Sequence, residues 1–406
     1  MTRDLDTLIG LLALAISYGL VIVLVVKHVN YGLALFLGAI VLGIFFGIDF
    51  NGILSTLTMT ASEQITYELV LAVSLIPIFA QTMIESKLID EIVDGLKAML
   101  SQRAVLAIIP SVFGLFPMMG GALISAPLID GEAEKLKVDS EKRSLINLWF
   151  RHMWFFVSPL VTTLIVVCRI TNMNIYDIIV VDFPAFIVYV VLGYFLLIKP
   201  IKSYDIKKGE DNFFYKFLKG IVPVALTIVS NILGLHLIFS LLLGIFSAIL
   251  LGKIKLTNIT TVIRKGFRWP LVTSVLGALY FRNVIRYMHV DSFIVENAIS
   301  FGFPTIAFFS LIPLIFGFIT AEPQTSAIMS ASLVTGAFEK FIPAQVALLY
   351  ISSFLAYFTS PLHLCLILTV GFFKSKIREV FKWLVPFSVL VYCVQFAVCY
   401  LLIEYF

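Results

Sequence analysis

The sequence predicts an all-α polytopic membrane protein built from two inverted repeats. Each repeat is expected to hold five transmembrane helices, a re-entrant hairpin and a helix broken at Ser-Pro. The first observation is composition: 60% of the 406 residues are hydrophobic, only 13% are charged and the mean hydropathy is +1.03. In soluble proteins about a quarter of the residues are charged. The second observation is a sequence pattern that recurs half a chain apart. The third is that basic residues cluster between the apolar runs.

Ten apolar stretches approach the ~20 residues that a helix needs to cross a bilayer. The stretch at the start of the chain follows Met1–Asp4, which lacks the basic region and cleavage site of a secretory signal, so we expect a retained helix. The ten predicted spans begin around Leu8, Tyr31, Tyr67, Ile146, Ile178, Phe217, His236, Pro270, Val346 and Val385.

The recurring pattern indicates an internal duplication. Gly114 and Gly317 lie 203 residues apart in apolar runs interrupted by small and polar residues, and Ser158 and Ser360, each followed by Pro-Leu, lie 202 apart. Paired, interrupted hydrophobic segments in two halves of a chain are typical of the binding site of a secondary transporter. The predicted parts are a first repeat 1–205 with hairpin 103–130 and broken helix 146–168, and a second repeat 206–406 with hairpin 303–335 and broken helix 343–372.

Basic residues predict the orientation of these spans. By the positive-inside rule, the four Lys- and Arg-rich segments are cytoplasmic. The stretch from Gln102 to Asp130 has basic flanks on both sides and therefore cannot cross, which predicts a re-entrant hairpin. Five crossings in each half then place the halves in opposite orientations, with both termini outside the plasma (inner) membrane. The four basic segments are Lys135–Arg143, Lys199–Lys219, Lys253–Arg268 and Lys374–Lys382, and two interfacial arms are expected at Glu85–Gln102 and Arg286–Ser300.

The hairpin tips and helix breaks are the predicted substrate and ion site. A half-helix that ends inside the membrane leaves backbone groups unpaired; its N-terminus favours anions, while free carbonyls favour Na+ or compete for protons. Glycines at the first tip allow close backbone approach. The candidate residues are Met118, Gly120, Gly121, Ser125, Asn147, Arg151 and Ser158 in the first half, and Glu322, Gln324, Thr325, Ser326, Thr359, Ser360 and His363 in the second.

Several of these residues have two interpretations. Glu322 is a carboxylate in an apolar hairpin, which by default marks an ion pathway or proton relay. Arg151 either pairs with an anionic substrate or extends to the cytoplasmic interface. His363 either titrates or packs as a neutral ring. Ser158 and Ser360 either ligate an ion or repair the proline kink.

Other features exclude function classes. The chain has no phosphate-binding loop, no HExxH and no Gly-x-Ser-x-Gly, so neither ATP-driven pumping nor these hydrolase mechanisms are supported. The net charge of +4 is small and its basic residues lie in loops, which excludes a nucleic-acid partner. Cys168, Cys365, Cys393 and Cys399 form no CxxC pair and have no histidine at metal spacing. We therefore expect small buried side chains, no cofactor and no metal except possible Na+ at the hairpin tips. Arg282 and Arg286, one turn apart, are expected to be an interface anchor.

Three motifs resemble an uncharacterised prokaryotic integral membrane family within the ion-transporter superfamily, which includes gluconate permeases, citrate and dicarboxylate carriers and arsenite permeases. They are Pro117–Pro127, Phe150–His152 and Ser360–Cys365. The resemblance implies a homodimer of scaffold regions and a transport region that moves in an elevator-type cycle. The chain departs from the carboxylate carriers because neither hairpin has a Ser-Asn-Thr tip. Glu322 therefore makes H+ an alternative to Na+ as the coupling ion.

The expected function is secondary active transport of a small organic anion of the carboxylate class, coupled to Na+ or H+. The expected partners are the lipid bilayer, the anionic substrate and a second copy of the chain. A passive channel for a small solute is the alternative, since inverted hairpins alone also suit a pore. An intramembrane enzyme, using Ser158 with His152 or Glu322 as proton acceptor, is a third interpretation that no recognised nucleophile motif supports.

Overall fold

The computed structural model describes residues 2–116, 121–202, 212–290, 304–335 and 340–405, together with residues 302 and 338. Helices make up the described parts of the chain, and no strand occurs in them. In the first half these are α1 (Thr2–Val26), α2 (Tyr31–Phe45), α3 (Phe50–Ser62), α4 (Gln64–Glu85), α5 (Leu88–Met99), α6 (Gln102–Gly114), α7 (Gly121–Lys135), α8 (Ser140–His152), α9 (Thr162–Thr171) and α10 (Ile175–Leu192), with a 3-10 segment η1 (Met153–Phe155) and a π-helical segment η2 (Gly193–Ile198). In the second half they are α11 (Phe213–Ile232), α12 (Leu237–Leu251), α13 (Leu256–Gly266), α14 (Trp269–Tyr287), α16 (Ile306–Thr320), α17 (Pro323–Val334), α18 (Pro343–Phe358), α19 (Leu364–Phe373) and α20 (Ile377–Tyr405).

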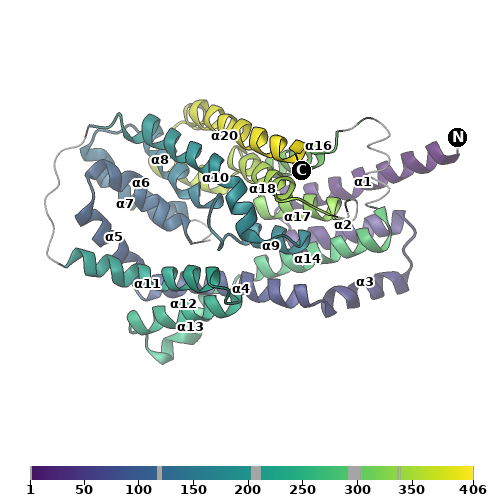
Figure 1. Ribbon diagram of the computed structural model, residues 1–406, viewed down its shortest axis with the longest axis horizontal. Coiled ribbons are helices and arrows are strands. Elements are labelled where there is room, and N and C mark those ends of the chain that lie inside the picture. Colours follow the sequence, from purple (N-terminus) through teal and green to yellow (C-terminus); the bar gives the residue numbers. More distant parts are fainter. Residues whose placement is uncertain are drawn as a thin grey trace.

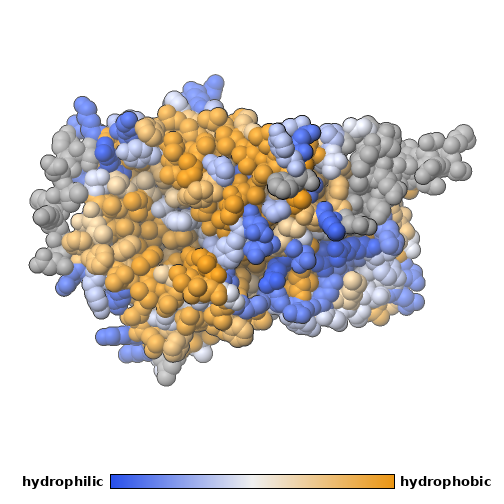
Figure 2. Space-filling view, in the orientation of Figure 1, coloured by the Kyte–Doolittle hydropathy of each residue, from blue (hydrophilic) through white to orange (hydrophobic). Residues whose placement is uncertain are grey.

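The chain is a polytopic membrane protein by helix length, composition and surface. Among the described residues, Gln64–Glu85, Ile175–Ile198, Phe213–Ile232 and Ile377–Tyr405 are long and apolar enough to cross a bilayer, and several shorter apolar helices accompany them. Figure 2 shows apolar residues over most of the middle of one face. Large apolar side chains such as Val180 and Phe239 are more than half exposed, as expected for groups that face lipid.

The helices pack as two bundles, each built from both halves of the chain. The first bundle comprises α1–α5 and α11–α14, and the second bundle comprises α6–α10 and α16–α20. In Figure 1, α3, α4, α11, α12, α13 and α14 lie in the lower part and α8, α10, α18 and α20 in the upper part. Away from the chain connection between α5 and α6, the main contacts between the bundles are α14 with α17, α4 with α9 and α1 with α16. The bundles are therefore internally tight and share a smaller boundary.

The same helix packing occurs in both halves. In the first half α6 packs on α7 and α8, and in the second half α16 packs on α17 and α18. The arrangement is also exchanged between halves, because α9 packs on α17 while α19 packs on α7. Figure 1 shows α6 and α7 toward one end of the molecule and α16 and α17 toward the other. The boundaries of the two repeats and their orientation in the membrane stay predictions.

Backbone details also recur at the spacing of the Ser-Pro breaks. Pro184 and Pro386 lie 202 residues apart inside α10 and α20. Asn172 and Lys374, also 202 apart, end α9 and α19 in the left-handed conformation, with φ of 55° and 52°. A left-handed residue after the last turn lets the final carbonyls be paired. The repetition therefore extends to the way in which individual helices are ended.

Two glycines allow a close helix crossing that both halves share. A Cβ on Gly114 would lie 1.9 Å from the backbone oxygen of Arg151, and one on Gly317 would lie 2.7 Å from that of Ser353. Arg151 and Ser353 are again 202 residues apart. Small residues let helix backbones approach in membranes, where packing rather than the hydrophobic effect drives association. The crossing positions the C-terminal end of α8 against the first hairpin.

A second close approach holds the first bundle together and carries a prediction. A Cβ on Gly277 of α14 would lie 2.2 Å from the backbone oxygen of Gly32 in α2. Because backbone cannot move aside like a flexible side chain, we expect Gly277→Ala to lower the free energy of unfolding by about 1–3 kcal/mol. Thermal unfolding of the detergent-purified variant measures this. Gly371→Ala is the matched control, since no heavy atom lies within 4 Å of its Cβ position; equal losses in both variants would contradict the close crossing.

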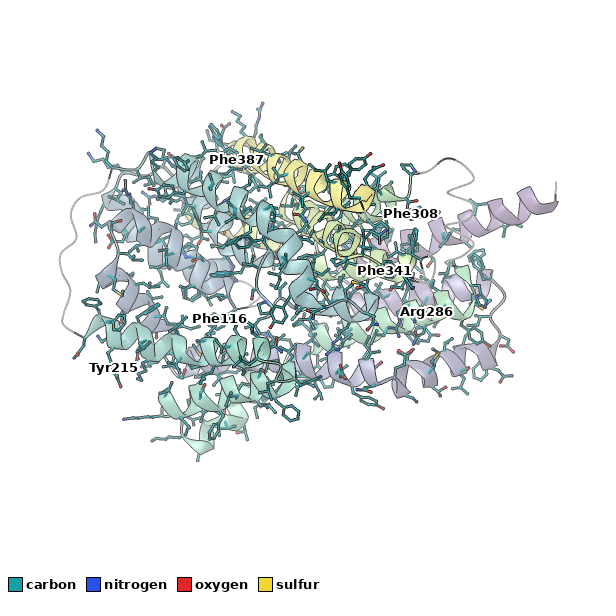
Figure 3. The ribbon with its side chains drawn as sticks, viewed as in Figure 1. Phe116, Tyr215, Arg286, Phe308, Phe341 and Phe387 are labelled. Carbon is teal, nitrogen blue, oxygen red and sulfur yellow. The ribbon has the colours of Figure 1, made fainter. Side chains whose placement is uncertain are left out.

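The structure corrects the interpretation of Arg282 as an interface anchor. Its side chain is only 4% exposed and forms an ion pair with Glu63, which precedes α4. Arg286, one turn later, is exposed. Figure 2 shows a hydrophilic band at the lower right, in the part of the molecule where Figure 3 labels Arg286. A charged residue buried with a partner is a structural element, because an unpaired charge there is expensive.

The expected interfacial arm at Glu85–Gln102 contains the amphipathic helix α5, whose apolar face packs on α11. Residues 291–300 of the second expected arm lie outside the described residues. The short helices α3 and α13 were not expected from the sequence.

Candidate functional site

A cavity of about 280 Å³ lies at the boundary between the two bundles. The first bundle contributes residues of α2 and α14. The second bundle contributes the ends of α6, α8 and α18, the starts of α9 and α19, and the tip between α16 and α17. The polar lining residues are Tyr31, Arg151, His152, Thr162, Thr163, Ser274, Glu322, Gln324, Tyr357 and Cys365. The hairpin tip and both helix breaks therefore meet at one small space.

Arg151 is the basic residue among these. It lies near the C-terminal end of α8, where a cation is favoured by the helix dipole. Its side chain is buried, with 6% of the residue exposed, and Nη1 donates to the carbonyl oxygen of Phe113 at 3.2 Å. Arg151 is therefore a buried residue of the cavity lining, and its pairing with an anion stays a prediction.

Glu322 is the acidic residue of the cavity. α16 ends at Thr320, Ala321 takes the left-handed conformation with φ of 50°, and Glu322 is the N-cap of α17. Its carboxylate accepts a hydrogen bond from the backbone nitrogen of Thr325. The carboxylate thus caps the positive end of its own half-helix. Among the described residues that line it, the cavity holds one arginine and one glutamate, which come from different halves of the chain.

Two other half-helices begin at the cavity without a side-chain cap. The N-caps of α9 and α19 are Val161 and His363, and neither side chain accepts from its helix. Thr162 and Thr163 at the start of α9 line the cavity, as do Leu364 and Cys365 at the start of α19. Unpaired backbone N–H groups at a helix start attract negative charge. These two starts and Arg151 give the cavity three sources of positive potential.

Ser158 and Ser360 perform the same structural role at the two breaks. The hydroxyl oxygen of each accepts from the backbone nitrogen two residues later, Leu160 and Leu362, at 3.3 Å. Ser360 also donates to the carbonyl oxygen of Phe318 at 2.7 Å. Neither serine lines the cavity. Each hydroxyl thus pairs a backbone N–H just after the break, while repair of the proline kink through a carbonyl and ion ligation both stay predictions.

Several predicted site residues form hydrogen bonds away from the cavity, either between helices or within one helix. Asn147 is fully buried, accepts from Ser125 at 2.7 Å and donates to Thr369 at 3.3 Å, which joins α7, α8 and α19. Ser326 donates to the carbonyl oxygen of Pro313 at 2.9 Å. Thr359 donates within its own helix to the carbonyl oxygen of Leu355 at 2.8 Å.

Two other predicted residues have buried polar atoms without a hydrogen-bond partner among the described residues. Others lie outside the described residues. The amide nitrogen of Gln324 and the hydroxyl of Thr325 are buried without a partner among the described residues, and Gln324 lines the cavity. Gly121 is the first residue of α7. Met118 and Gly120 lie outside the described residues.

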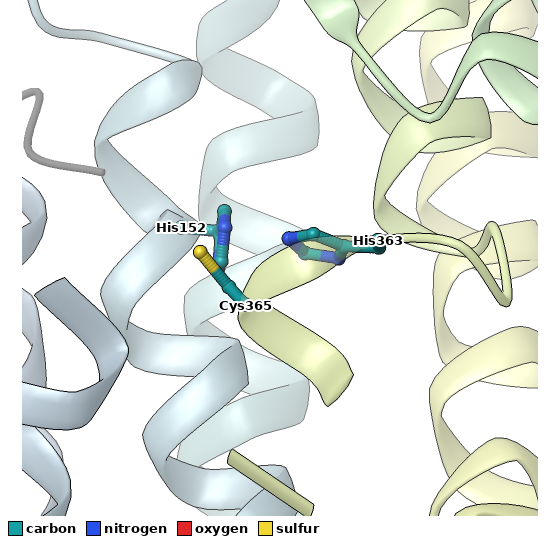
Figure 4. Close-up of side chains that lie close together, drawn as sticks. All are labelled: His152, His363 and Cys365. Atoms are coloured by element: carbon teal, nitrogen blue, oxygen red, sulfur yellow. The ribbon is translucent and has the colours of Figure 1, made fainter. Parts of the chain in front are cut away.

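Cys393, expected to be buried, is exposed, and Cys365 lies beside two histidines. His152, His363 and Cys365 each offer a ligand atom, and the three atoms lie within 4.8 Å of one another. Figure 4 shows one ring nitrogen of His363 directed at the other two side chains. Cys365 thus has histidine neighbours, one of them only two residues away, although no metal-site spacing is present in the sequence. The two histidines are 211 residues apart in the chain, so only folding joins them.

A buried carboxylate outside the cavity was also missed. Asp182 of α10 is fully buried and accepts from the amide of Gln395 in α20 at 2.8 Å. The signal was available, because an acidic residue inside an apolar span is rare and is usually paired or functional.

These helices and this cavity define a polytopic α-helical membrane protein whose polar groups gather at half-helix ends. The chain belongs to the family described as "Protein of unknown function (DUF401)", whose model matches residues 9–403. It is similar in structure to the YdaH transporter of Alcanivorax borkumensis, which has been described as having an unusual topology. That match has a TM-score of 0.63 at 12% identity and covers 88% of this chain and 90% of that one. No curated protein matches the sequence. The match shows a shared fold, and membership of the ion-transporter superfamily stays a prediction.

Proposed function

We propose that this protein is a secondary active transporter that moves a small organic anion, of the carboxylate class, in a cycle coupled to Na+ or H+. The observation that carries the proposal is the cavity, where buried Arg151 and the uncapped starts of α9 and α19 converge. Its volume of about 280 Å³ suits a small solute, since sites for drug-sized ligands span about 300–1,000 Å³. The transporter fold of the YdaH protein supports the same class.

The electrostatics of the cavity favour a carboxylate. Arg151 presents a guanidinium, whose planar donors match a carboxylate group. The two helix starts add backbone N–H groups at the same space, as in other anion sites at helix N-termini. Glu322, from the second half of the chain, adds a negative charge to the cavity. This charge would repel a bare anion unless a cation or proton offsets it. This arrangement supports coupled entry of an anion with Na+ or H+.

The two-bundle architecture supports an elevator-type cycle. Most of the polar lining belongs to the second bundle, while Tyr31 and Ser274 of the first bundle cover the cavity from the other side. The boundary between bundles is smaller than their internal packing. A bundle that carries the anion site can therefore slide against the other without breaking its own helix contacts. The first bundle would be the scaffold, and a homodimer would form through it.

A thermal-shift screen of detergent-purified protein tests the proposal. We expect one of gluconate, citrate, succinate or aspartate to raise the unfolding temperature, in a manner that depends on Na+ or on pH, whereas a shift with arsenite alone would contradict the carboxylate class. A ligand at a hundredfold excess over Kd stabilises the native state by about 2.7 kcal/mol. A shift that requires Na+ supports Na+ coupling, and a Na+-independent shift that grows at low pH supports proton coupling through Glu322.

Transport itself is measured in proteoliposomes with an imposed Na+ or H+ gradient. Gradient-dependent, saturable uptake of the stabilising anion supports a coupled carrier. Flux that neither saturates nor depends on a gradient would replace the proposal with a passive channel. Failure of every anion to bind and to move would overturn the carboxylate class.

A further inference from the structure

We propose that His152, His363 and Cys365 form a binding site for a thiophilic transition-metal ion of the Zn2+ type, open to the cavity. The three donor atoms lie within 4.8 Å of one another. Four-coordinate zinc with bonds of about 2.0–2.3 Å has ligand atoms roughly 3.3–3.8 Å apart, so closure requires side-chain movements of about 1 Å. The inference does not depend on the transported anion.

The hydrogen bonds of both histidines leave a nitrogen available for a metal. Nδ1 of His152 lies 2.8 Å from the carbonyl oxygen of Leu148, and Nδ1 of His363 lies 3.3 Å from that of Phe358. A carbonyl only accepts, so each Nδ1 carries the proton and each Nε2 carries a lone pair. A backbone carbonyl that orients the ring through its second nitrogen is the usual outer partner of a metal-bound histidine.

The unused nitrogen of His363 is the second, independent observation. His363 is fully buried, and its Nε2 has no hydrogen-bond partner among the described residues. A buried polar atom without a partner is destabilising unless a ligand or water completes it. Figure 4 shows one ring nitrogen of His363 directed at His152 and Cys365. The Nδ1 contact with Phe358 identifies this nitrogen as Nε2.

The repeat shows that these residues are not part of the duplicated plan. At the 202-residue spacing of the Ser-Pro breaks, His152 corresponds to Phe354, His363 to Val161 and Cys365 to Thr163. The other half therefore fills the same three places with two apolar side chains and a threonine. Because the other half packs these positions without histidine or cysteine, packing alone does not explain the three ligand residues.

The donor set indicates the class of ion. Two imidazoles and one thiolate suit Zn2+ and other thiophilic ions better than Mg2+ or Ca2+, which prefer oxygen. On binding, the thiol of Cys365 loses its proton to the solvent and the sulfur forms the metal bond. His152 and Cys365 line the cavity, so the fourth position faces that space and is filled by water or by a solute.

Metal titration of the full-length protein tests this site. Chelator-treated protein in detergent is titrated with Co2+, whose thiolate charge-transfer and four-coordinate visible bands report the ligand set, and then with Zn2+. We expect one ion per chain. The variants Cys365→Thr and His152→Phe use the side chains of the equivalent positions, and each should weaken binding by about 100-fold, at or beyond the loss typical of outer-shell partners. Cys393→Ser, at an exposed position, is the matched control and should bind as the parent does.

A second measurement needs no change at the site. In the Cys393→Ser background, Zn2+ is expected to protect Cys365 from maleimide, since Cys168 and Cys399 are buried. Absence of binding, unchanged affinity in Cys365→Thr, or full maleimide labelling at saturating Zn2+ would each overturn the proposal. A charge-transfer band that disappears in Cys393→Ser instead would assign the metal to the protein surface.

Discussion

Glu63→Ala is expected to lower the free energy of unfolding by about 3 kcal/mol, because it leaves the guanidinium of Arg282 buried without its carboxylate. Arg282 is 4% exposed and Glu63 is 22% exposed at the side chain. Among the described residues, the guanidinium then retains the neutral oxygen of Asn283, which it contacts at 3.0 Å and 3.1 Å. A neutral acceptor compensates a buried charge less well than a carboxylate does.

The ion pair belongs to a network that joins three helices. Asn283 is fully buried and donates to the hydroxyl of Thr60 at 2.9 Å. Thr60 lies in α3, Glu63 precedes α4 and Arg282 lies in α14. Loss of the carboxylate therefore weakens the contact between α14 and the α3–α4 turn as well as leaving a charge unpaired.

Denaturant titration in mixed micelles measures the effect. Glu85→Ala is the matched control, because Glu85 pairs with Lys265 at 2.8 Å while the side chains are 34% and 56% exposed. An exposed pair contributes at most about 1 kcal/mol. The double variant Glu63→Leu with Arg282→Met removes both charges and should be less destabilised than Glu63→Ala alone. Equal losses for Glu63→Ala and Glu85→Ala would show that the buried pair is not special.

Arg151→Gln is expected to weaken binding of the transported anion by about 100-fold, which corresponds to about 2.8 kcal/mol. The change removes a buried positive charge that lines the cavity while keeping a polar side chain of similar length. Arg151→Lys keeps the charge without the planar donors and should give an intermediate loss. The effect should exceed that of any substitution in the hydrogen-bonded network around Asn147, which does not line the cavity.

The ligand-induced thermal shift and the uptake rate in proteoliposomes measure this change. Arg169→Gln is the control, because Arg169 is 46% exposed at its side chain, pairs with Glu68 at 3.2 Å and does not line the cavity. The unfolding temperature without ligand separates lost binding from lost folding. If anion affinity is the same in Arg151→Gln and in Arg169→Gln, the cavity is not the anion site.

The elements predicted best are those that local chemistry decides. The Ser-Pro pairs at Ser158 and Ser360 break helices because proline lacks a donor and clashes with the preceding turn. The tip at Glu322 ends one helix and caps the next, as its sequence pattern of an acid before proline favours. Short helices such as α3 were missed because an amphipathic segment of 13 residues resembles a loop in hydropathy.

The site was predicted less completely than the helices. Arg151, Glu322 and Gln324 line the cavity, while Asn147 and Ser326 turned out to bind other side chains and backbone groups. Polar residues in an apolar helix look alike in sequence whether they hold a ligand or a neighbouring helix. The difference depends on which face the helix turns toward the cavity, and that is settled by its partners.

The sequence by itself determined that the chain is a helical membrane protein, where its helices break and that its two halves follow one plan. Apolar length and proline act locally along the chain, and the recurrence of the same residues half a chain apart can be read directly from the sequence. Only the tertiary structure decided that α9 packs on α17 and α19 on α7. That exchange brings Arg151 and Glu322 to one cavity and His152 beside His363. Contacts between residues so far apart depend on how whole helices pack, and hydropathy carries no information about the partner that each helix selects.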